Sequence, residues 1–192
     1  MKNLVKIVLA ALFFIVFSMN VLAQKIENVK TTGIKAGINF PVGTWSSDYS
    51  TGFNVADLTK WNITKNVRIL GRMEVTFFGG TEVTQTVTYY GHSYTNTYQT
   101  NPFGILTAGS GVELSFIGNG GPYAILDFPS MNIIVGKLTD VRVGFGAGFG
   151  FEFSIGKALL GLEVRGNLYN AFLTQKAEQS IAGVQLGFEA AY

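Results

Sequence analysis

The segment from Val141 to Ile155 alternates strictly between two kinds of residue. Apolar side chains, most of them large, occupy the odd positions, and the even positions hold four glycines, Arg142, Glu152 and Ser154. A β-strand sends alternate side chains to opposite faces, whereas a helix would mix these residues. The segment therefore predicts a strand with one apolar face and one face that is small or polar. The apolar face includes Phe145, Phe149, Phe151 and Phe153.

The same alternation recurs along most of the chain and predicts seven further strands. They cover residues 33–40, 52–61, 67–77, 103–116, 122–134, 160–169 and 182–192. Two positions disturb the pattern. Asp57 falls on an apolar face, and Pro129 removes a backbone donor, which indicates a bulge or a kink. The pattern alone leaves the strand register undecided at both positions.

The number of apolar residues indicates which face points outward. The interior of an eight-stranded barrel is only just filled by side chains, so roughly forty large apolar residues cannot all point inward. We therefore predict an all-β fold, an eight-stranded antiparallel up-and-down transmembrane β-barrel whose apolar face contacts lipid. A closed barrel satisfies every backbone group within the membrane. The predicted lipid-facing residues are Phe145, Phe149, Phe151, Phe153, Leu160, Leu162 and Phe188.

The opposite face carries charges of both signs, which are costly in a narrow lumen unless they are paired. We predict a salt-bridge network that fills the barrel. A gated ion path is the alternative, and an open pore is not expected because such channels need about sixteen strands. The predicted network consists of Lys35, Arg68, Arg72, Glu74, Glu113, Arg142, Glu152, Glu163, Arg165 and Glu189.

The first residues are typical of a secretory signal peptide. Two lysines precede the apolar run Ile7 to Phe17, and small residues end at Ala23, which predicts a signal at residues 1–23 with cleavage near Ala23. An uncleaved N-terminal anchor is the alternative. Residues 24–32 are a short polar lead-in, and the predicted barrel domain covers residues 33–192.

Charge and composition exclude several classes of function. The leader holds two lysines and no acid, so the remaining chain carries 12 basic and 12 acidic residues. This balance does not favour nucleic-acid binding, which needs a clustered basic surface. The chain has no cysteine, which excludes disulfides and thiolate metal sites. We predict neither a cofactor nor a metal.

Connection lengths and aromatic residues predict the orientation. The connections after the second, fourth and sixth strands are short, as periplasmic turns are, and those after the first, third and seventh are longer. Aromatic residues near strand ends are expected to form interfacial girdles. The predicted girdle and C-terminal signal comprise Trp61, Tyr169, Phe172, Phe188 and Tyr192, with Tyr123 near the inner rim and Trp45 near the outer rim.

Gly79 to Thr100 is the longest polar connection and predicts a β-ribbon that turns near Gly91 and projects beyond the membrane. Aromatic side chains at such a tip bury area at low entropic cost, so they are candidate contacts for an external partner. Simple cross-strand pairing is the alternative explanation. The candidate contact residues are Tyr89, Tyr90, His92, Tyr94 and Tyr98.

Two other functions are compatible with the pattern. An outer-leaflet lipid-modifying enzyme could use His92 as base and Ser93 as nucleophile, with Glu82 as the nearest acid in sequence. A soluble periplasmic barrel with inverted faces could bind a hydrophobic ligand. The main hypothesis is a non-enzymatic barrel with a structural or surface-interaction role.

Three segments carry a family resemblance: Gly33 to Phe40, Gly148 to Phe153 and Gly187 to Tyr192. With them, the chain resembles the small eight-stranded outer-membrane β-barrel proteins of Gram-negative bacteria, the group shaped like the OmpA membrane domain. The resemblance implies export to the outer membrane, contact with its lipid, and recognition of the C-terminal strand by the barrel-assembly machinery. It leaves the external partner unknown, because members serve structural, adhesive, protective or enzymatic roles.

Overall fold

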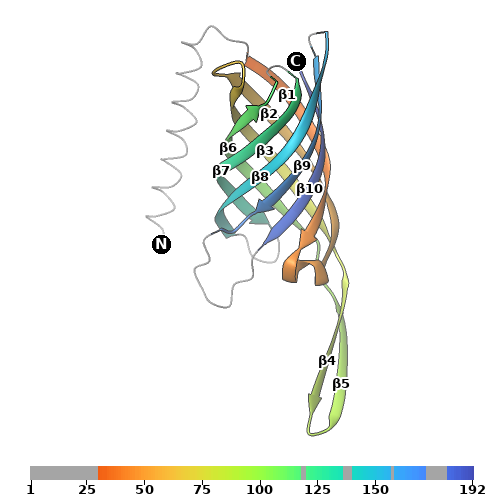
Figure 1. Cartoon of the computed structure of the whole chain (residues 1–192). Coiled ribbons are helices and arrows are strands. Elements are labelled where there is room, and N and C mark those ends of the chain that lie inside the picture. The colour runs from red at the N-terminus through yellow and green to blue at the C-terminus, as the bar shows by residue number, and fades with distance from the viewer. Residues whose placement is uncertain (1–29, 118–119, 136–139, 157, 172–180) are drawn as a thin grey trace, which may run out of the picture.

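A computed structural model describes residues 30–117, 120–135, 140–156, 158–171 and 181–192 (Figure 1). The predicted signal peptide at residues 1–23 and the predicted girdle residue Phe172 lie outside the described residues. Within the described part of the chain, no helix is both long and apolar enough to cross a membrane.

Eight strands form a closed antiparallel barrel in the order β1-β10-β9-β8-β7-β6-β3-β2. This confirms the predicted fold class. The barrel strands are β1 (Lys30–Val42), β2 (Tyr49–Asn62), β3 (Val67–Gly80), β6 (Phe103–Ser115), β7 (Gly121–Val135), β8 (Asp140–Ile155), β9 (Ala158–Leu168) and β10 (Ala182–Ala191). A short 3-10 helix, η1 (Gly43–Ser47), joins β1 to β2. Strands β4 (Glu82–Tyr89) and β5 (His92–Gln99) form a separate two-stranded ribbon.

The barrel closes where β1 pairs with β10. Their register runs from Gly33 opposite Ala191 to Val42 opposite Ala182. At the end of this seam, the Tyr192 backbone N–H donates to the Thr32 carbonyl at 2.9 Å. The strand begins at Lys30, three residues before its predicted start, because residues 30–32 pair with Trp61, Lys60 and Thr59 of β2.

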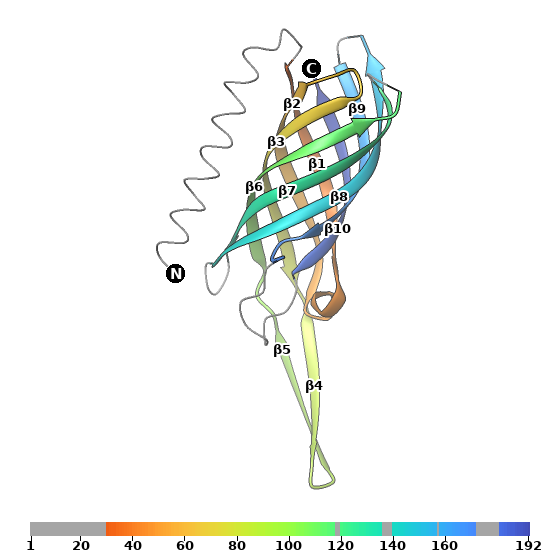
Figure 2. The same cartoon turned by 60° about the vertical axis from the view of Figure 1, so that its left-hand side comes forward.

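The barrel has two unlike ends. One end, which we call the turn end, is where β2 leads to β3, β6 to β7 and β8 to β9 by short connections, and the C-terminus lies there (Figure 1). The other, the ribbon end, carries η1 and the β4–β5 ribbon, which extends well beyond the barrel in both views (Figure 2). The ribbon was predicted, and its turn at Tyr90 and Gly91 is where the sequence placed it.

The two disturbed positions behave differently. At Pro129, the β7–β8 register shifts between Asp127 and Ser130, so the predicted bulge is present. The bulge changes which positions point inward, and both Asp127 and Ser130 are buried. At Asp57 the register is unbroken, with Ile34 and Met73 as its paired neighbours. Since no bulge turns it inward, Asp57 is exposed on the outer, apolar face.

Candidate functional site: a closed lumen and a projecting ribbon

The lumen contains a dense set of buried charges. Nine of the ten predicted network residues are buried inside the barrel, and Lys60 and Asp127 join them. Such a concentration is tolerated only if the charges are paired. Among the described residues, the buried cations are Lys35, Lys60, Arg68, Arg72 and Arg165, and the buried carboxylates are Glu74, Glu113, Asp127, Glu152, Glu163 and Glu189.

Lys60 is the centre of one ion cluster near the turn end. Its Nζ lies 2.6 Å from a carboxylate oxygen of both Glu152 and Glu189, and 3.1 Å from Glu113 Oε2. Arg68 Nη1 also contacts Glu113 at 2.9 Å and Glu152 at 2.7 Å. These five residues, the Lys60 cluster, stand on β2, β3, β6, β8 and β10. The cluster therefore ties together strands from all sides of the barrel.

A second cluster lies farther along the lumen and is centred on Arg165. Its guanidinium pairs with Asp127, and its Nε lies 2.8 Å from Glu163 Oε1. Lys35 pairs with the same Glu163 carboxylate. Arg72 Nη2 lies 3.1 Å from Asp127 and its Nη1 lies 3.4 Å from Glu74. This Arg165 cluster comprises Lys35, Arg72, Glu74, Asp127, Glu163 and Arg165.

Tyr123 connects the two clusters. Its hydroxyl donates to Glu163 Oε2 at 3.1 Å, and Lys60 Nζ lies 5.4 Å from its ring centroid. The ring packs with Leu70 and Ile125 and is only 1% exposed. The prediction that Tyr123 lies at the inner rim is therefore wrong. Its ring has space inside the lumen because its register partner on the neighbouring strand β8 is Gly150, where any Cβ would overlap the tyrosine ring.

A layer of neutral polar groups lies beyond the Arg165 cluster. Asn39 donates to Asn54 at 3.0 Å, and the Thr107 hydroxyl donates to Asn132 at 2.8 Å. The Asn132 amide in turn donates to the Tyr169 backbone carbonyl at 2.8 Å. The first two hydrogen bonds join neighbouring strands, and the third joins β7 to the end of β9, which is not adjacent to it. The amide layer carries no charge.

Aromatic residues fill the ribbon end of the lumen. Phe78 and Phe103 stack at 5.1 Å between ring centroids, and Trp45 from η1 meets Phe103 edge-on at 4.5 Å. Tyr169 and Ile105 complete this buried cluster, the aromatic plug. Trp45 and Tyr169 were predicted in the outer girdle, and that prediction is wrong. They cover the end of the lumen instead, since their rings find apolar partners there.

The inward residues of β3 show the order of these layers. From the turn end they are Arg68 in the Lys60 cluster, Leu70 beside Tyr123, Arg72 and Glu74 in the Arg165 cluster, Thr76, and Phe78 in the aromatic plug. An interior crossed by two ion clusters, an amide layer and an aromatic plug is packed with side chains, as expected for eight strands.

Three charged residues differ from the prediction. Arg142 is not part of either cluster. It lies at the rim, where its guanidinium contacts the Asp140 carboxylate at 2.5 Å. Lys60 and Asp127 were missed. Lys60 follows the inward alternation of β2, so its signal was present in the sequence. Asp127 points inward like Tyr123, and only the structure shows this parity, because it places both side chains in the lumen.

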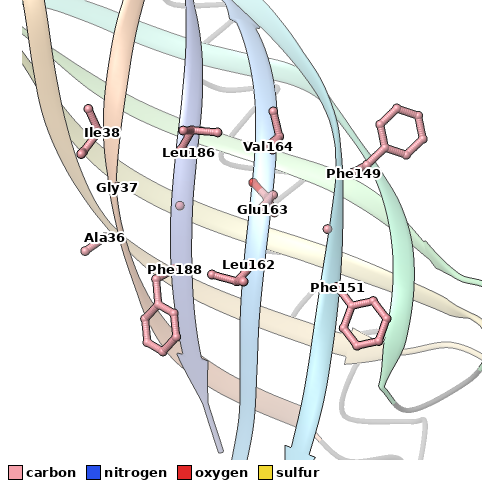
Figure 3. A pocket seen from close by; sticks show the side chains of 12 residues that line it. Ala36, Gly37, Ile38, Phe149, Phe151, Leu162, Glu163, Val164, Leu186 and Phe188 are labelled. Atoms are coloured by element: carbon pink, nitrogen blue, oxygen red, sulfur yellow. The ribbon is translucent and has the colours of Figure 1, made fainter.

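The outer surface is apolar. Phe149 is 71% exposed and Phe188 is 50% exposed, and Phe145, Phe151, Phe153 and Leu162 also point outward, while Leu160 is half-buried. Phe149 and Phe151 flank one side of a shallow hollow, Ile38 and Phe188 flank the other, and Leu162 lies between them (Figure 3). Trp61 is half-buried near the turn end, and Tyr192 is 81% exposed at the same end.

Every residue of β4 and β5 is exposed except Val83, which is half-buried. Its register pairs Val83 with Tyr98, Val87 with Tyr94, and Tyr89 with His92. Those pairs lie on one face, because side chains alternate along each strand. The other face carries hydroxyl pairs formed by Thr84 with Thr97, Thr86 with Thr95, and Thr88 with Ser93. The tyrosines are therefore cross-strand partners and exposed at the same time.

This chain folds into a closed barrel with an apolar exterior and a filled polar interior. The fold is similar to that of Neisserial surface protein A. That crystal structure matches at a TM-score of 0.57 with 13% sequence identity, and the match covers 84% of this chain and 94% of that chain. The similarity shows the fold of a small outer-membrane β-barrel.

Two other solved structures match less closely. A de novo designed transmembrane β-barrel matches at a TM-score of 0.42 and 10% identity, over 84% of this chain and 93% of that one. The attachment invasion locus protein Ail of Yersinia pestis, solved with the heparin analogue sucrose octasulfate, matches at a TM-score of 0.42 and 11% identity, over 86% of this chain and 100% of that one. No protein-family model and no curated protein matches the sequence.

The residues of the enzyme hypothesis are not brought together. His92 and Ser93 are adjacent on β5, so their side chains lie on opposite faces of the ribbon. The Ser93 hydroxyl pairs with Thr88 at 3.1 Å. Glu82 begins β4 at the base of the ribbon, about 20 Å from His92 at the rise of a β-strand. This arrangement does not form a nucleophile, a base and an orienting acid.

Proposed function

We propose that this protein is a non-enzymatic outer-membrane barrel that anchors the β4–β5 ribbon outside the cell. The observation that carries the proposal is the contrast between the two parts. The barrel is filled by ion clusters and an aromatic plug, and the ribbon projects with every residue of β5 exposed. A rigid support with an exposed extension fits a surface-interaction role better than transport.

The exterior supports a membrane location. Large apolar side chains, among them Ile34, Phe53 and Phe149, are more than half exposed around the barrel. Such a surface is unfavourable in water and favourable in lipid. The hollow between Phe149 and Phe188 has a lining that suits a lipid acyl chain.

The orientation follows from the unlike ends. Short connections are typical of the periplasmic side and long ones of the external side, so the ribbon end faces outward. The proposal includes export with signal cleavage near Ala23. It also includes recognition of β10 by the barrel-assembly machinery, for which Phe188 and Tyr192 are accessible contacts at 50% and 81% exposure.

Cysteine labelling tests the location and the orientation in one experiment. The chain has no cysteine, so single replacements give unambiguous signals. Thr86→Cys lies on the exposed ribbon, and its matched control Lys65→Cys lies on an exposed turn at the opposite end. We expect a membrane-impermeant maleimide to label Thr86→Cys on intact cells. Lys65→Cys should react only after the outer membrane is permeabilised.

Two results contradict the proposal. Recovery of the protein in the soluble periplasmic fraction would exclude a membrane barrel, and labelling of Lys65→Cys alone on intact cells would reverse the orientation.

A separate measurement tests the lumen. The purified protein in planar bilayers should show no steady conductance, because the lumen is filled. A stable open conductance would instead favour the gated ion path.

A further inference from the structure

The two faces of the β4–β5 ribbon differ in how their polar groups are used. On one face, which we call the ladder face, hydroxyl groups pair across the strands at 3.1–3.2 Å. The opposite face, the tyrosine face, presents Tyr89 at 65%, Tyr94 at 64% and Val87 at 62% exposure. The tyrosine face comprises Val83, Gln85, Val87, Tyr89, His92, Tyr94, Asn96 and Tyr98.

The hydroxyl groups of the ladder face hydrogen-bond to one another, whereas the tyrosine face leaves large rings exposed. Each hydroxyl of the ladder face already has a cross-strand partner, which also holds the two strands in register. On the tyrosine face, large rings remain in contact with water beyond the barrel. Exposed aromatic surface of this kind suits an interaction site. The tyrosine face is therefore the candidate contact face of the ribbon.

The tyrosine face carries no formal charge, and Glu82 at the base of β4 lies on the ladder face. Residues 83–99 contain no lysine, arginine, aspartate or glutamate. A surface that recognises sulfate, phosphate or carboxylate groups uses arginine and lysine, and none is present on either ribbon strand. A surface that recognises a cationic partner would need carboxylates, and the tyrosine face has none. The absence of charged side chains therefore favours a neutral partner.

Amide groups separate the rings of the tyrosine face. The Gln85–Asn96 pair lies between the Val83–Tyr98 pair and the Val87–Tyr94 pair. Gln85 donates to the Tyr98 hydroxyl at 3.2 Å, so the amide is held beside the ring. A protein-binding hot spot has a continuous apolar centre with its polar groups at the rim. Here hydrogen-bonding groups occupy the middle of the face, between ring surfaces.

We propose that the tyrosine face binds an uncharged glycan. The C–H faces of sugar rings stack on Tyr94 and Tyr98, and the sugar hydroxyls exchange hydrogen bonds with Gln85 and Asn96. From Val83 to Tyr89 the face is about 20 Å long at the rise of a β-strand, which accommodates several consecutive sugars. The inference rests on the proposed external position of the ribbon, and it adds the face and the chemical class of the partner.

The shape of the tyrosine face also predicts the affinity of a single ribbon for a glycan. A flat, open face buries less ligand surface than a cleft, so each contact is weak. Several barrels displayed on one cell can engage a polymer together, which raises the overall affinity through effective concentration. Tyrosine rings lose little conformational freedom on binding, which suits an exposed platform.

The test uses full-length protein in lipid nanodiscs on an array of neutral, sulfated and sialylated oligosaccharides. We expect binding to a subset of the neutral oligosaccharides. Tyr94→Thr combined with Tyr98→Thr should weaken that binding by at least about tenfold, because the stacking surface is lost. The matched control, Thr86→Val with Thr95→Val, changes the ladder face at the same height and should change affinity less than about twofold. Threonine and valine both favour strands, so the ribbon is preserved.

Several outcomes overturn the inference. Binding restricted to sulfated or sialylated glycans, or the absence of binding to any array member, excludes a neutral glycan. Self-association in sedimentation that the tyrosine variant abolishes would assign the face to a second copy of the chain. Equal losses in the tyrosine and ladder variants would show a general effect on the ribbon. Because nanodisc binding does not depend on cellular orientation, its failure is distinguishable from a failure of the labelling experiment.

Discussion

Lys60 Nζ lies 2.6 Å from Glu152 Oε1, and this ion pair joins β2 to β8 across the barrel. In the closed sheet the two strands are separated by three others in either direction. The contact therefore spans the lumen from one wall to the other. It is a buried cross-link between residues that are 92 positions apart in the sequence.

Replacing Lys60 with methionine should destabilise the barrel strongly. The substitution keeps the length of the side chain but leaves Glu113, Glu152 and Glu189 with one fewer cation. Breaking a buried pair in this way costs about 3–5 kcal/mol. Urea unfolding in lipid vesicles measures the loss. Lys30→Met, at an exposed position of the same barrel, is the control, and equal effects of the two substitutions would refute a central role for the Lys60 cluster.

Gly150→Ala should also destabilise the fold, because a Cβ at this position overlaps the Tyr123 ring. Overpacking of this kind costs about 1–3 kcal/mol. The matched change is Gly166→Ala, whose Cβ would meet its nearest neighbour, the Ala147 carbonyl oxygen, at 3.9 Å and fits without strain. The unfolding free energies of both variants in the same vesicles check the prediction. Full stability of Gly150→Ala would show that Tyr123 does not fill the space above the glycine.

Asp57→Val should stabilise the protein in a bilayer. Asp57 is exposed between Ile34 and Met73, which are 64% and 61% exposed on the lipid-facing surface. Removing a carboxylate from lipid contact gains about 1–2 kcal/mol, with valine supplying better strand propensity. Urea midpoints in vesicles provide the measurement, with Glu82→Val on the ribbon as the control outside the membrane. A lower midpoint for Asp57→Val would show that the carboxylate has a stabilising partner in the membrane.

The barrel should fold without the ribbon. Thr81 and Thr100 lie at its base, where the Thr100 N–H donates to the Thr81 carbonyl at 2.9 Å. An Asn-Gly turn in place of residues 82–99 therefore closes the connection without moving β3 or β6. We expect heat-modifiable migration on a gel and an unfolding free energy within about 1 kcal/mol of the full chain. Failure of the shortened chain to fold would make the ribbon part of the folding unit.

His92→Ala should leave the lipid A of the host cell unchanged. His92 and Ser93 lie on opposite faces of β5, and the Ser93 hydroxyl pairs with Thr88. A catalytic base has to reach its nucleophile within hydrogen-bond distance. Mass spectrometry of extracted lipid A from cells with the native and variant proteins provides the comparison. A lost modification in the variant would restore the enzyme hypothesis.

Alternation determined most of the fold from the sequence. All eight barrel strands, the projecting ribbon and the direction of the apolar face follow from a period of two and from the limited space inside eight strands. The same pattern placed Phe149 and Phe151 outside and Glu113 and Glu152 inside. These features are local, since each depends only on neighbours along one strand.

Only the tertiary structure decided which inward groups meet. The partners of Lys60 come from β6, β8 and β10, and strand register across the closed sheet determines their distances. The bulge at Pro129 changes the parity of β7, which one strand's sequence leaves undecided. Tyr123 turns inward because Gly150 on the neighbouring strand β8 leaves space for its ring, and Trp45 and Tyr169 turn inward because other aromatic residues pack against them. Their partners lie far away in the sequence, so no pattern along a single strand contains that information.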